Sequence, residues 1–239
     1  MILKDLGMLA SINPRSKAYL QIMGKNGYIP NFILILDDEK SFKDEFKSTS
    51  TFGFGKTFNP HEELLQTIRN LQISYEFCST CDPNDSLVVS MLKERNEKYF
   101  VYSGPGGKIL RKEILTVGKK FIHMHPGSIP EYKGSTTIYY SILKEGRCGV
   151  TAFFMNEEID RGEIIKMKKL DKPKPGEDID YYYDCSIRAA ILKEILDVYV
   201  SKDEFPRETL LQNANEETYF IIHPVLKHVA ILECQKEDE

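Results

Sequence analysis

The chain has 239 residues, 41% of them hydrophobic, which is enough for one large domain with a proper core. Its 32 basic and 36 acidic residues leave a net charge of -4, so nucleic acid is disfavoured as the main ligand. No apolar run approaches the roughly 18 residues of a membrane span, and the start lacks a long apolar signal core. The five cysteines, an odd number, fit a reducing compartment, and we expect a cytoplasmic protein.

The first half of the chain alternates short apolar strands with amphipathic helices. Runs rich in branched and aromatic residues predict four buried strands, at NFILILDD, ISYEFCS, KYFVYSG and KFIHMHP. Helical spacing of apolar residues predicts three helices, at PHEELLQTIRNLQ, PNDSLVVSMLKERNEK and KILRKEILTVGK. The second helix should be capped by Asp82 or Asn84, and the third should close at Gly118.

The second half predicts a helix, a hairpin and a long helix. STTIYYSILKEG reads as a helix, and CGVTAFFMNEEID and EIIKMKKLD read as strands joined at the DRGE turn. The longest helical pattern covers residues 177–202, and its tyrosines at 181–183 are interpreted as packing residues. The tail ETYFIIHPVLKHVAIL predicts a terminal strand or short helix. We therefore expect a catalytic unit over residues 1–170, with residues 171–239 packed on it as a dependent extension.

This alternation is typical of an α/β, Rossmann-like fold, a mostly parallel sheet with helices on both faces. Ligands of such sheets bind at the carboxyl ends of the strands. Three sequences occupy such ends here: DDEKSF, SGPGGK and MHPGSIP. The glycine-rich SGPGGK would let backbone amides approach a flat or anionic ligand closely, although alone it is a weak signal.

Two other motifs indicate ordinary structure. Cys78 and Cys81 form a single C-x-x-C, and without a second such pair at zinc-finger spacing we interpret them as a strand end turning into a helix. Gly55, Lys56 and Thr57 imitate a phosphate loop, but Ser50 stands where that loop needs glycine, so FGFGKTF is interpreted as a mobile loop.

His123 and His125 are the strongest candidates for a functional site. Residues two apart on an extended strand face the same side, so both rings should face one site. With Asp160 in range, two imidazoles and a carboxylate could hold a divalent ion, as in a metal-dependent hydrolase. An acid–base pair and a purely structural turn are the alternatives. A hydrolytic centre usually needs further ligands, and His223 and His228 lie in the distant tail.

The run from Phe121 to Ile165 resembles the core of the folate-dependent formyltransferases, which formylate methionyl-tRNA, glycinamide ribonucleotide and nucleotide-linked amino sugars. In that family a strand ends in Asn-x-His-Pro, and the chain continues through a Pro turn, an Arg-Gly pair, a helix and a Gly-Val-Thr strand to Asp-x-Gly. The counterparts here are His123-Met124-His125-Pro126, Ser128-Ile129-Pro130, Lys133-Gly134, Gly149-Val150-Thr151 and Asp160-Arg161-Gly162. The resemblance is good over residues 99–170 and extends to the earlier half only in its strand and helix rhythm.

The chain departs from this family pattern in several places. His123 stands where the family has asparagine, Gly127 where it usually has serine, and Lys133 where arginine is common. The first 21 residues also lack the family's usual opening strand and Gly-Thr-Pro turn, and give only a partial substitute.

The resemblance implies an N-formyltransferase with 10-formyltetrahydrofolate as donor. It makes His125 the catalytic imidazole and Asp160 either its partner or the proton acceptor. We hypothesise that His123 replaces the asparagine amide as an oxyanion donor. It places the folate against Ser103, Gly104, Gly106, Gly107, Ile109, Glu157 and Glu158, and the acceptor near Lys133, Gly134 and Ser135. It implies no metal ion.

The acceptor is interpreted as a nucleotide-linked amino-deoxysugar, in a route to surface polysaccharide or a nonulosonic acid such as pseudaminic acid. Transfer RNA is disfavoured by the acidic balance and by the absence of a basic C-terminal domain. We expect neither nucleic-acid nor membrane partners, and a homodimer is an open alternative. Methionyl-tRNA or purine-precursor formylation, a non-catalytic formyl-binding module and the metal-dependent hydrolase are the rival hypotheses.

Overall fold

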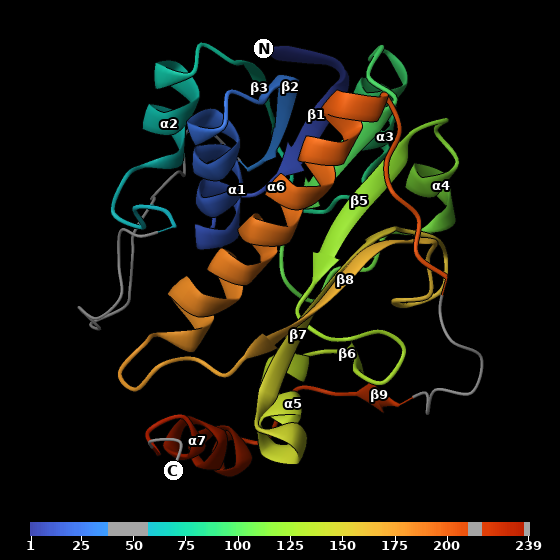
Figure 1. Cartoon of the computed structure of the whole chain (residues 1–239). Coiled ribbons are helices and arrows are strands. Elements are labelled where there is room, and N and C mark those ends of the chain that lie inside the picture. The colour runs from blue at the N-terminus through green and yellow to red at the C-terminus, as the bar shows by residue number, and fades with distance from the viewer. Residues whose placement is uncertain (38–56, 210–216, 237–239) are drawn as a thin grey trace.

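The protein is built around one seven-stranded sheet, seen in the computed structural model, which describes residues 1–37, 57–209 and 217–236 (Figure 1). The strand order is β3-β2-β1-β4-β5-β7-β8. The first five strands in this order run parallel, whereas β7 pairs antiparallel with both β5 and β8. The strands are β1 (Ile2–Ala10), β2 (Ile29–Leu36), β3 (Ser74–Cys78), β4 (Tyr99–Ser103), β5 (Lys120–His125), β7 (Arg147–Phe154) and β8 (Ile164–Asp171).

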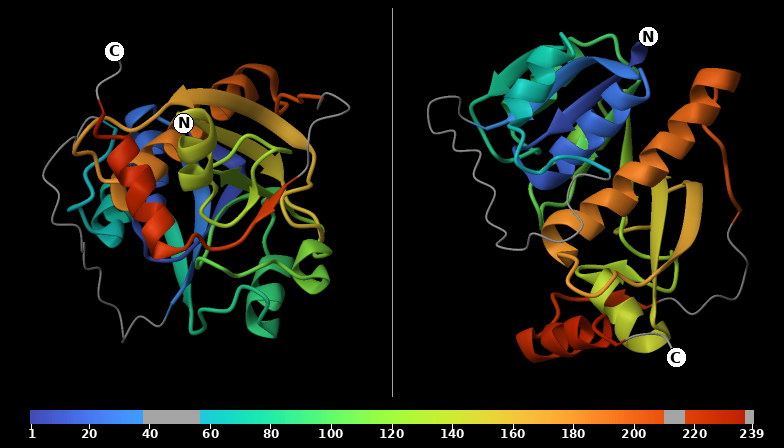
Figure 2. Two further views of the ribbon diagram at one scale, coloured as in Figure 1. Left: turned by 90° about the horizontal axis from the view of Figure 1, so that it is seen from below. Right: turned by 60° about the vertical axis from the view of Figure 1, so that its left-hand side comes forward.

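Helices cover both faces of this sheet, as two turned views make clear (Figure 2). One buried cluster joins α1, α2 and α6 to one face, and a second joins α3 and α4 to the other. The mostly parallel α/β fold predicted from the sequence is therefore confirmed. The helices are α1 (Pro14–Lys25), α2 (Leu64–Asn70), α3 (Ser86–Lys93), α4 (Lys112–Leu115), α5 (Thr137–Glu145), α6 (Asp184–Lys202) and α7 (Pro224–Glu233), with a π-helical turn (Ile179–Tyr183) before α6.

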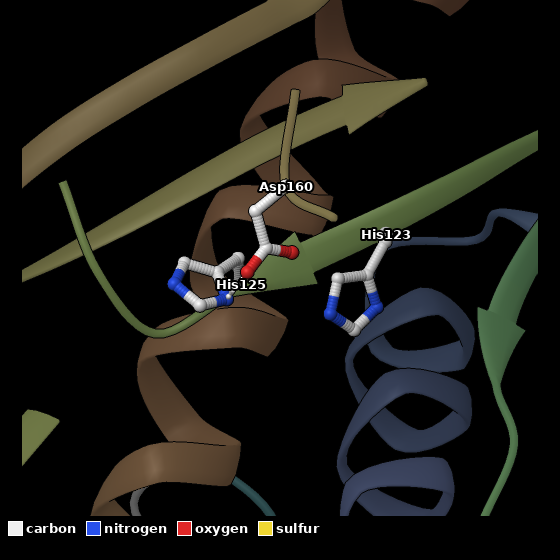
Figure 3. A group of neighbouring side chains, drawn as sticks. All are labelled: His123, His125 and Asp160. Carbon is white, nitrogen blue, oxygen red and sulfur yellow. Dashed lines mark ion pairs between the residues drawn. The ribbon is translucent and has the colours of Figure 1, made fainter. Parts of the chain in front are cut away.

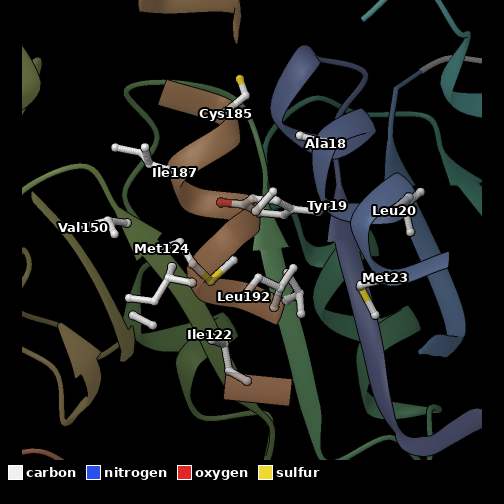
Figure 4. Close-up of a cluster of buried hydrophobic side chains, with 14 of the residues drawn as sticks. Ala18, Tyr19, Leu20, Met23, Ile122, Met124, Val150, Cys185, Ile187 and Leu192 are labelled. Carbon is white, nitrogen blue, oxygen red and sulfur yellow. The ribbon is translucent and has the colours of Figure 1, made fainter. Parts of the chain in front are cut away.

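Strand β5 separates the hydrophobic core from the site. Ile122 and Met124 lie in the cluster that includes Tyr19 of α1 and Leu192 of α6 (Figure 4). Because successive side chains of a strand alternate between faces, His123 and His125 lie on the other face of β5. Burial of the apolar pair thus fixes the register that presents both imidazoles at the strand's carboxyl end.

The opening strand is the main correction to the sequence-based expectation. Residues 1–21 were predicted to give only a partial substitute for it, yet β1 lies at the centre of the sheet between β2 and β4. The apolar pattern of β1 is interrupted by charged residues near the start of the strand and by Gly7. A Cβ at Gly7 would lie 2.6 Å from Cε1 of Phe100, so the close approach of that ring requires glycine there.

Two predicted helix ends also differ. The cap of α3 is Asp85, whose side chain accepts from the backbone N–H of Leu87, rather than Asp82 or Asn84. The third predicted helix shrinks to the four residues of α4 and ends before Gly118, whose φ of 81° is a left-handed conformation. The predicted hairpin is present as β7 and β8.

The tail forms both of the alternatives predicted for it. A two-residue strand, β9 (Thr218–Tyr219), pairs parallel with β6 (Lys133–Gly134) in a second small sheet, and α7 follows. The backbone N–H of Ser135 donates to the carbonyl oxygen of Tyr219, and Thr136 Oγ1 accepts from the N–H of Ile222. These contacts bring the tail to the loop that follows β5.

The C-x-x-C pair has the ordinary structural role that the sequence predicted. Cys78 ends β3, Cys81 lies in the turn before α3, and both are free thiols. Most of the FGFGKTF segment, and DDEKSF after its first residue, lie outside the described residues. None of the described helices combines the length and apolar character needed to cross a membrane.

Candidate active site

His125 is the most firmly held side chain of the site. The residue is 2% exposed, and Nε2 lies 2.8 Å from the carbonyl oxygen of Tyr132 and 3.3 Å from Oγ1 of Thr137. A carbonyl oxygen can only accept, so Nε2 carries the proton. Nδ1 of the neutral ring then has a lone pair, and it faces Oδ2 of Asp160 at 3.5 Å (Figure 3).

Asp160 is brought to His125 by a strained turn between β7 and β8. Its φ of 51° lies in the left-handed region, which an aspartate adopts at a cost of order 1–3 kcal/mol. The same connection is also constrained at Gly162, because a Cβ there would fall 1.6 Å from the carbonyl oxygen of Phe154. The backbone N–H of Gly134 donates to Oδ2 of Asp160 at 2.8 Å. Such strain at a cavity points to a functional carboxylate.

His123 lies beside this pair but is held differently. Its ring lies 6.1 Å from that of Tyr102 and 5.7 Å, edge to face, from that of Phe153. Figure 3 shows one ring nitrogen turned toward Asp160 and His125 while Nδ1 points away. Nδ1 is buried and has no hydrogen-bond partner among the described residues. A minor hydrogen-bonding contribution from the backbone of Tyr102 opposes the lowering of the ring's pKa by burial, but no short, well-aligned bond fixes which nitrogen carries the proton.

Both imidazoles are shifted toward the neutral form. Burial, followed by the charges of Arg188 and Arg15, holds the pKa of His123 well below its usual 6.5. Burial also lowers the pKa of His125, against the opposing attraction of Asp160. At neutral pH the site therefore presents two uncharged imidazoles beside one carboxylate.

Two arginines border the site that the sequence analysis did not single out. Nη1 of Arg188, on α6, donates to the carbonyl oxygen of Met124 at 2.5 Å, and its Nε pairs with Asp184 at 3.0 Å. Arg15 follows β1 and donates to Oγ of Ser103 and to the carbonyl oxygen of Gly104. Arg188 could have been found from the sequence, because it is the single arginine in the apolar run SIRAAIL and follows an aspartate by four residues. Arg15 could have been found only if β1 had been recognised.

A cavity of about 550 Å³ opens above these groups. It is bordered by the loop after β4, by the turn that holds Asp160, and by the tail at residues 218–221. The exposed tail residues at its rim were not predicted as site residues. Of the predicted residues, its lining includes His123, His125, Asp160, Gly106, Gly107, Ile109, Glu158, Gly134 and Ser135.

Four predicted residues do not line this cavity. Ser103 and Lys133 are buried, and Oγ of Ser103 accepts hydrogen bonds from Ser16 and Arg15. Gly104 is occupied through its carbonyl oxygen, which accepts from Nη2 of Arg15 at 2.6 Å. Glu157 is exposed in the turn before Asp160. Ser103 and Gly104 thus support the cavity by holding Arg15 in place.

Comparison with known proteins agrees with this geometry. Residues 80–184 match the family described as formyl transferase. The methionyl-tRNA formyltransferase of Helicobacter pylori (strain HPAG1) is 30% identical over 148 residues, covering 61% of this chain and 43% of that protein. That of Ehrlichia ruminantium (strain Gardel) is 41% identical over 66 residues, 27% of this chain and 22% of that protein. The chain thus spans less than half the length of these curated relatives.

Solved structures share the fold. A sugar N-formyltransferase from Shewanella sp FDAARGOS_354 aligns with a TM-score of 0.58 at 17% identity, covering 96% of this chain and 87% of that one. The phosphoribosylglycinamide formyltransferase of Streptococcus pneumoniae TIGR4 aligns with a TM-score of 0.56 at 18% identity, covering 84% and 98% respectively. These comparisons support a folate-dependent formyltransferase family for residues 80–184, as the resemblance implied. The matched region includes both histidines and Asp160.

Proposed function

We propose that the protein transfers a formyl group from 10-formyltetrahydrofolate to the amino group of a nucleotide-linked amino sugar. The observation that carries this proposal is the pairing of His125 with Asp160, 3.5 Å apart on the floor of a cavity large enough for a reduced pteridine. The family match over residues 80–184 supports the donor, and the cavity supplies the groups that the chemistry requires.

Formyl transfer needs a proton to move from one nitrogen to another. The acceptor amine attacks the formyl carbon, a new C–N bond forms, and the carbonyl electron pair moves to oxygen. The intermediate then collapses, the bond between the formyl carbon and N10 of the folate breaks, and N10 receives the proton that the amine lost. The facing Nδ1 of His125 and carboxylate of Asp160 can take up and return that proton. The products are a formamide and tetrahydrofolate.

His123 is proposed to stabilise the oxyanion of the tetrahedral intermediate. Its ring nitrogen on the cavity side can donate an N–H because no short, well-aligned hydrogen bond fixes the tautomer at Nδ1. An imidazole can therefore fill the place of the asparagine amide. Water exclusion by the flanking rings of Tyr102 and Phe153 strengthens such a hydrogen bond.

The donor is proposed to lie against the loop after β4, where Gly106 and Gly107 border the cavity. A Cβ at Gly106 would meet nothing within 4 Å, so this glycine leaves its backbone open to a ligand rather than relieving an internal clash. Exposed Ile109 offers apolar surface beside it. On the opposite side, Glu158 borders the cavity near Asp160.

The sugar acceptor is favoured by the tail and by charge. The tail closes one rim of the cavity with the side chains of Tyr219, Phe220 and Ile221. Apolar and aromatic surface there suits the base and sugar of a nucleotide conjugate. The net charge of -4 disfavours a tRNA acceptor. The Shewanella neighbour, a sugar N-formyltransferase whose alignment covers 96% of this chain, is consistent with this choice.

We also propose that residues 171–239 fold with residues 1–170 and not alone. Helix α6 buries Ile191, Leu192, Ile195 and Leu196 in the same cluster as α1 and the central strands. That apolar surface would be exposed to water if the two parts were separated.

A mass-shift assay tests the proposal. The purified protein is incubated with 10-formyltetrahydrofolate and a panel of nucleotide-linked amino sugars, with glycinamide ribonucleotide and methionyl-tRNA as competing acceptors. We expect one sugar conjugate to gain the mass of one formyl group, and His125→Ala protein to leave it unchanged. Formylation of the purine precursor or the tRNA instead would reject the sugar assignment, and no formyl product with any amine would reject formyl transfer.

A further inference from the structure

The substitution that distinguishes this site, histidine at 123, places two imidazoles and one carboxylate together. His123, His125 and Asp160 each offer one ligand atom, and these atoms all lie within 4.8 Å of one another. No second group of three or more such side chains meets this condition in the described part of the chain. Ligands 2.0–2.2 Å from a tetrahedral zinc ion are roughly 3.3 Å apart, so small side-chain rotations would close the set.

The hydrogen bonds around His125 favour a cation between it and Asp160. Since Nε2–H donates to the carbonyl oxygen of Tyr132, the Nδ1 lone pair points at the lone pairs of Asp160 Oδ2, 3.5 Å away. Two acceptors face each other there, and a proton or a metal ion between them would satisfy both. Metal-bound histidines commonly donate their other ring N–H to a carbonyl oxygen in this way.

The chemistry of the set selects the class of metal. One carboxylate with two imidazoles suits borderline ions such as Zn²⁺, whereas Mg²⁺ and Ca²⁺ need mainly oxygen ligands. Arg188 is paired with Asp184, but Arg15 is held by neutral oxygens, so its positive charge opposes every divalent ion to the same degree. Selection among these ions therefore depends on their direct bonds to the imidazole nitrogens. The open cavity leaves room for water as a further ligand.

We infer that His123, His125 and Asp160 form a binding site for one zinc-class transition-metal ion, and that an ion held there blocks formyl transfer. The block, but not the binding, rests on the proposed function. The ion would occupy the His125 lone pair and the Asp160 carboxylate that proton transfer requires. Metal-bound and transfer-competent protein are thus mutually exclusive states of one site.

Metal binding is tested on tag-free, EDTA-dialysed protein titrated with ZnCl₂ against a chromophoric chelator. We expect one site per chain that Mg²⁺ and Ca²⁺ do not compete for. Loss of a group that only hydrogen-bonds to a metal ligand typically weakens metal binding roughly 10–100-fold. His123→Asn and Asp160→Asn each remove a ligand itself, so each should weaken Zn²⁺ binding by at least that factor. His228→Asn, which removes an exposed histidine, is the matched control and should bind as wild type does.

Thermal melting with and without Zn²⁺ keeps the test valid if one variant is unstable. An ion that binds only the folded chain raises the melting temperature of wild type and of the His228→Asn control, but not of a folded triad variant. Absence of a zinc site, or equal affinity in wild type and the triad variants, overturns the inference. Formyl transfer in metal-free protein that Zn²⁺ does not inhibit overturns the blocking step. Zinc binding without any formyl transfer would instead reject the proposed function and leave the metal site standing.

Discussion

The two sides of the cavity are built in opposite ways. The floor consists of buried His125 and half-buried Asp160, both held by hydrogen bonds with the backbone. The tail rim, which we define as residues 217–222, leaves Phe220 81% and Ile221 80% exposed. It is attached by a two-residue ladder and by Tyr219, whose ring lies 5.6 Å from that of Tyr132.

This difference suggests a division of work between the two sides. A rigid, over-determined floor suits chemistry, because small displacements of reacting groups cost large factors in rate. A rim with exposed apolar side chains suits recognition of a partly apolar acceptor. Substitutions in the floor should therefore act on turnover, and substitutions that displace the rim should act on acceptor affinity and stability.

The largest effect is expected at the floor. His125→Ala removes the imidazole that we propose relays the proton, and turnover should fall by about 10²–10⁴. Asp160→Asn keeps the shape but removes the negative charge, and it should fall in the same range. Single-turnover rates of formyl transfer, with melting curves to verify folding, measure both. Either variant turning over at the wild-type rate contradicts the assignment of these two groups.

His123 should give the next largest effect and separates chemistry from packing. His123→Ala removes the proposed oxyanion donor and should slow turnover by about 10²–10³. His123→Asn restores a donor amide and should retain much of the wild-type rate. The comparison of the two variants under saturating substrates is the measurement. If alanine is as active as asparagine, the ring has no part in stabilising the oxyanion.

The attachment of the rim is tested at Gly134. This glycine has a φ of 98°, and a Cβ there would lie 2.1 Å from the carbonyl oxygen of Tyr219. Gly134→Ala should lower the free energy of unfolding by about 1–3 kcal/mol and raise the acceptor KM. Gly146 is the matched control, because its φ of 63° is also positive but a Cβ meets nothing within 4 Å. Urea unfolding of the two variants separates the clash from the backbone strain; equal losses would show that the rim contact is unimportant.

A smaller effect is expected from pH. His123 and His125 have pKa values lowered in the folded chain, chiefly by burial, so the unfolded chain binds more protons below pH 6.5. Their contribution to stability is complete above pH 6.5 and is lost as the pH falls through their folded pKa values. The free energy of unfolding should therefore decrease below pH 6.5, and His123→Asn should flatten that decrease. His228→Asn should follow the wild-type curve, and an unchanged slope in His123→Asn would show that His123 is not buried as neutral imidazole.

Local patterns in the sequence were sufficient for much of the fold but not for its central strand. The four predicted strands are present: β2 and β4 are buried along most of their length, as apolar runs inside a parallel sheet must be, whereas β3 lies at the sheet edge and only Cys78 is fully buried in it. Strand β1 was missed because Gly7 and the charges before it weaken the local signal. Its place in the sheet depends on neighbours β2 and β4 and on the ring of Phe100, which only folding brings together.

The sequence by itself determined that His123 and His125 share one face at a strand end, because side chains of a strand alternate with a fixed period of two. It also carried the family pattern that links His125 to Asp160. Only the tertiary structure decided that Nε2 of His125 is tied to Tyr132, that Arg188 lies behind the site, and that the tail closes one rim. Those facts depend on contacts between segments far apart in the chain, whose geometry no local spacing encodes.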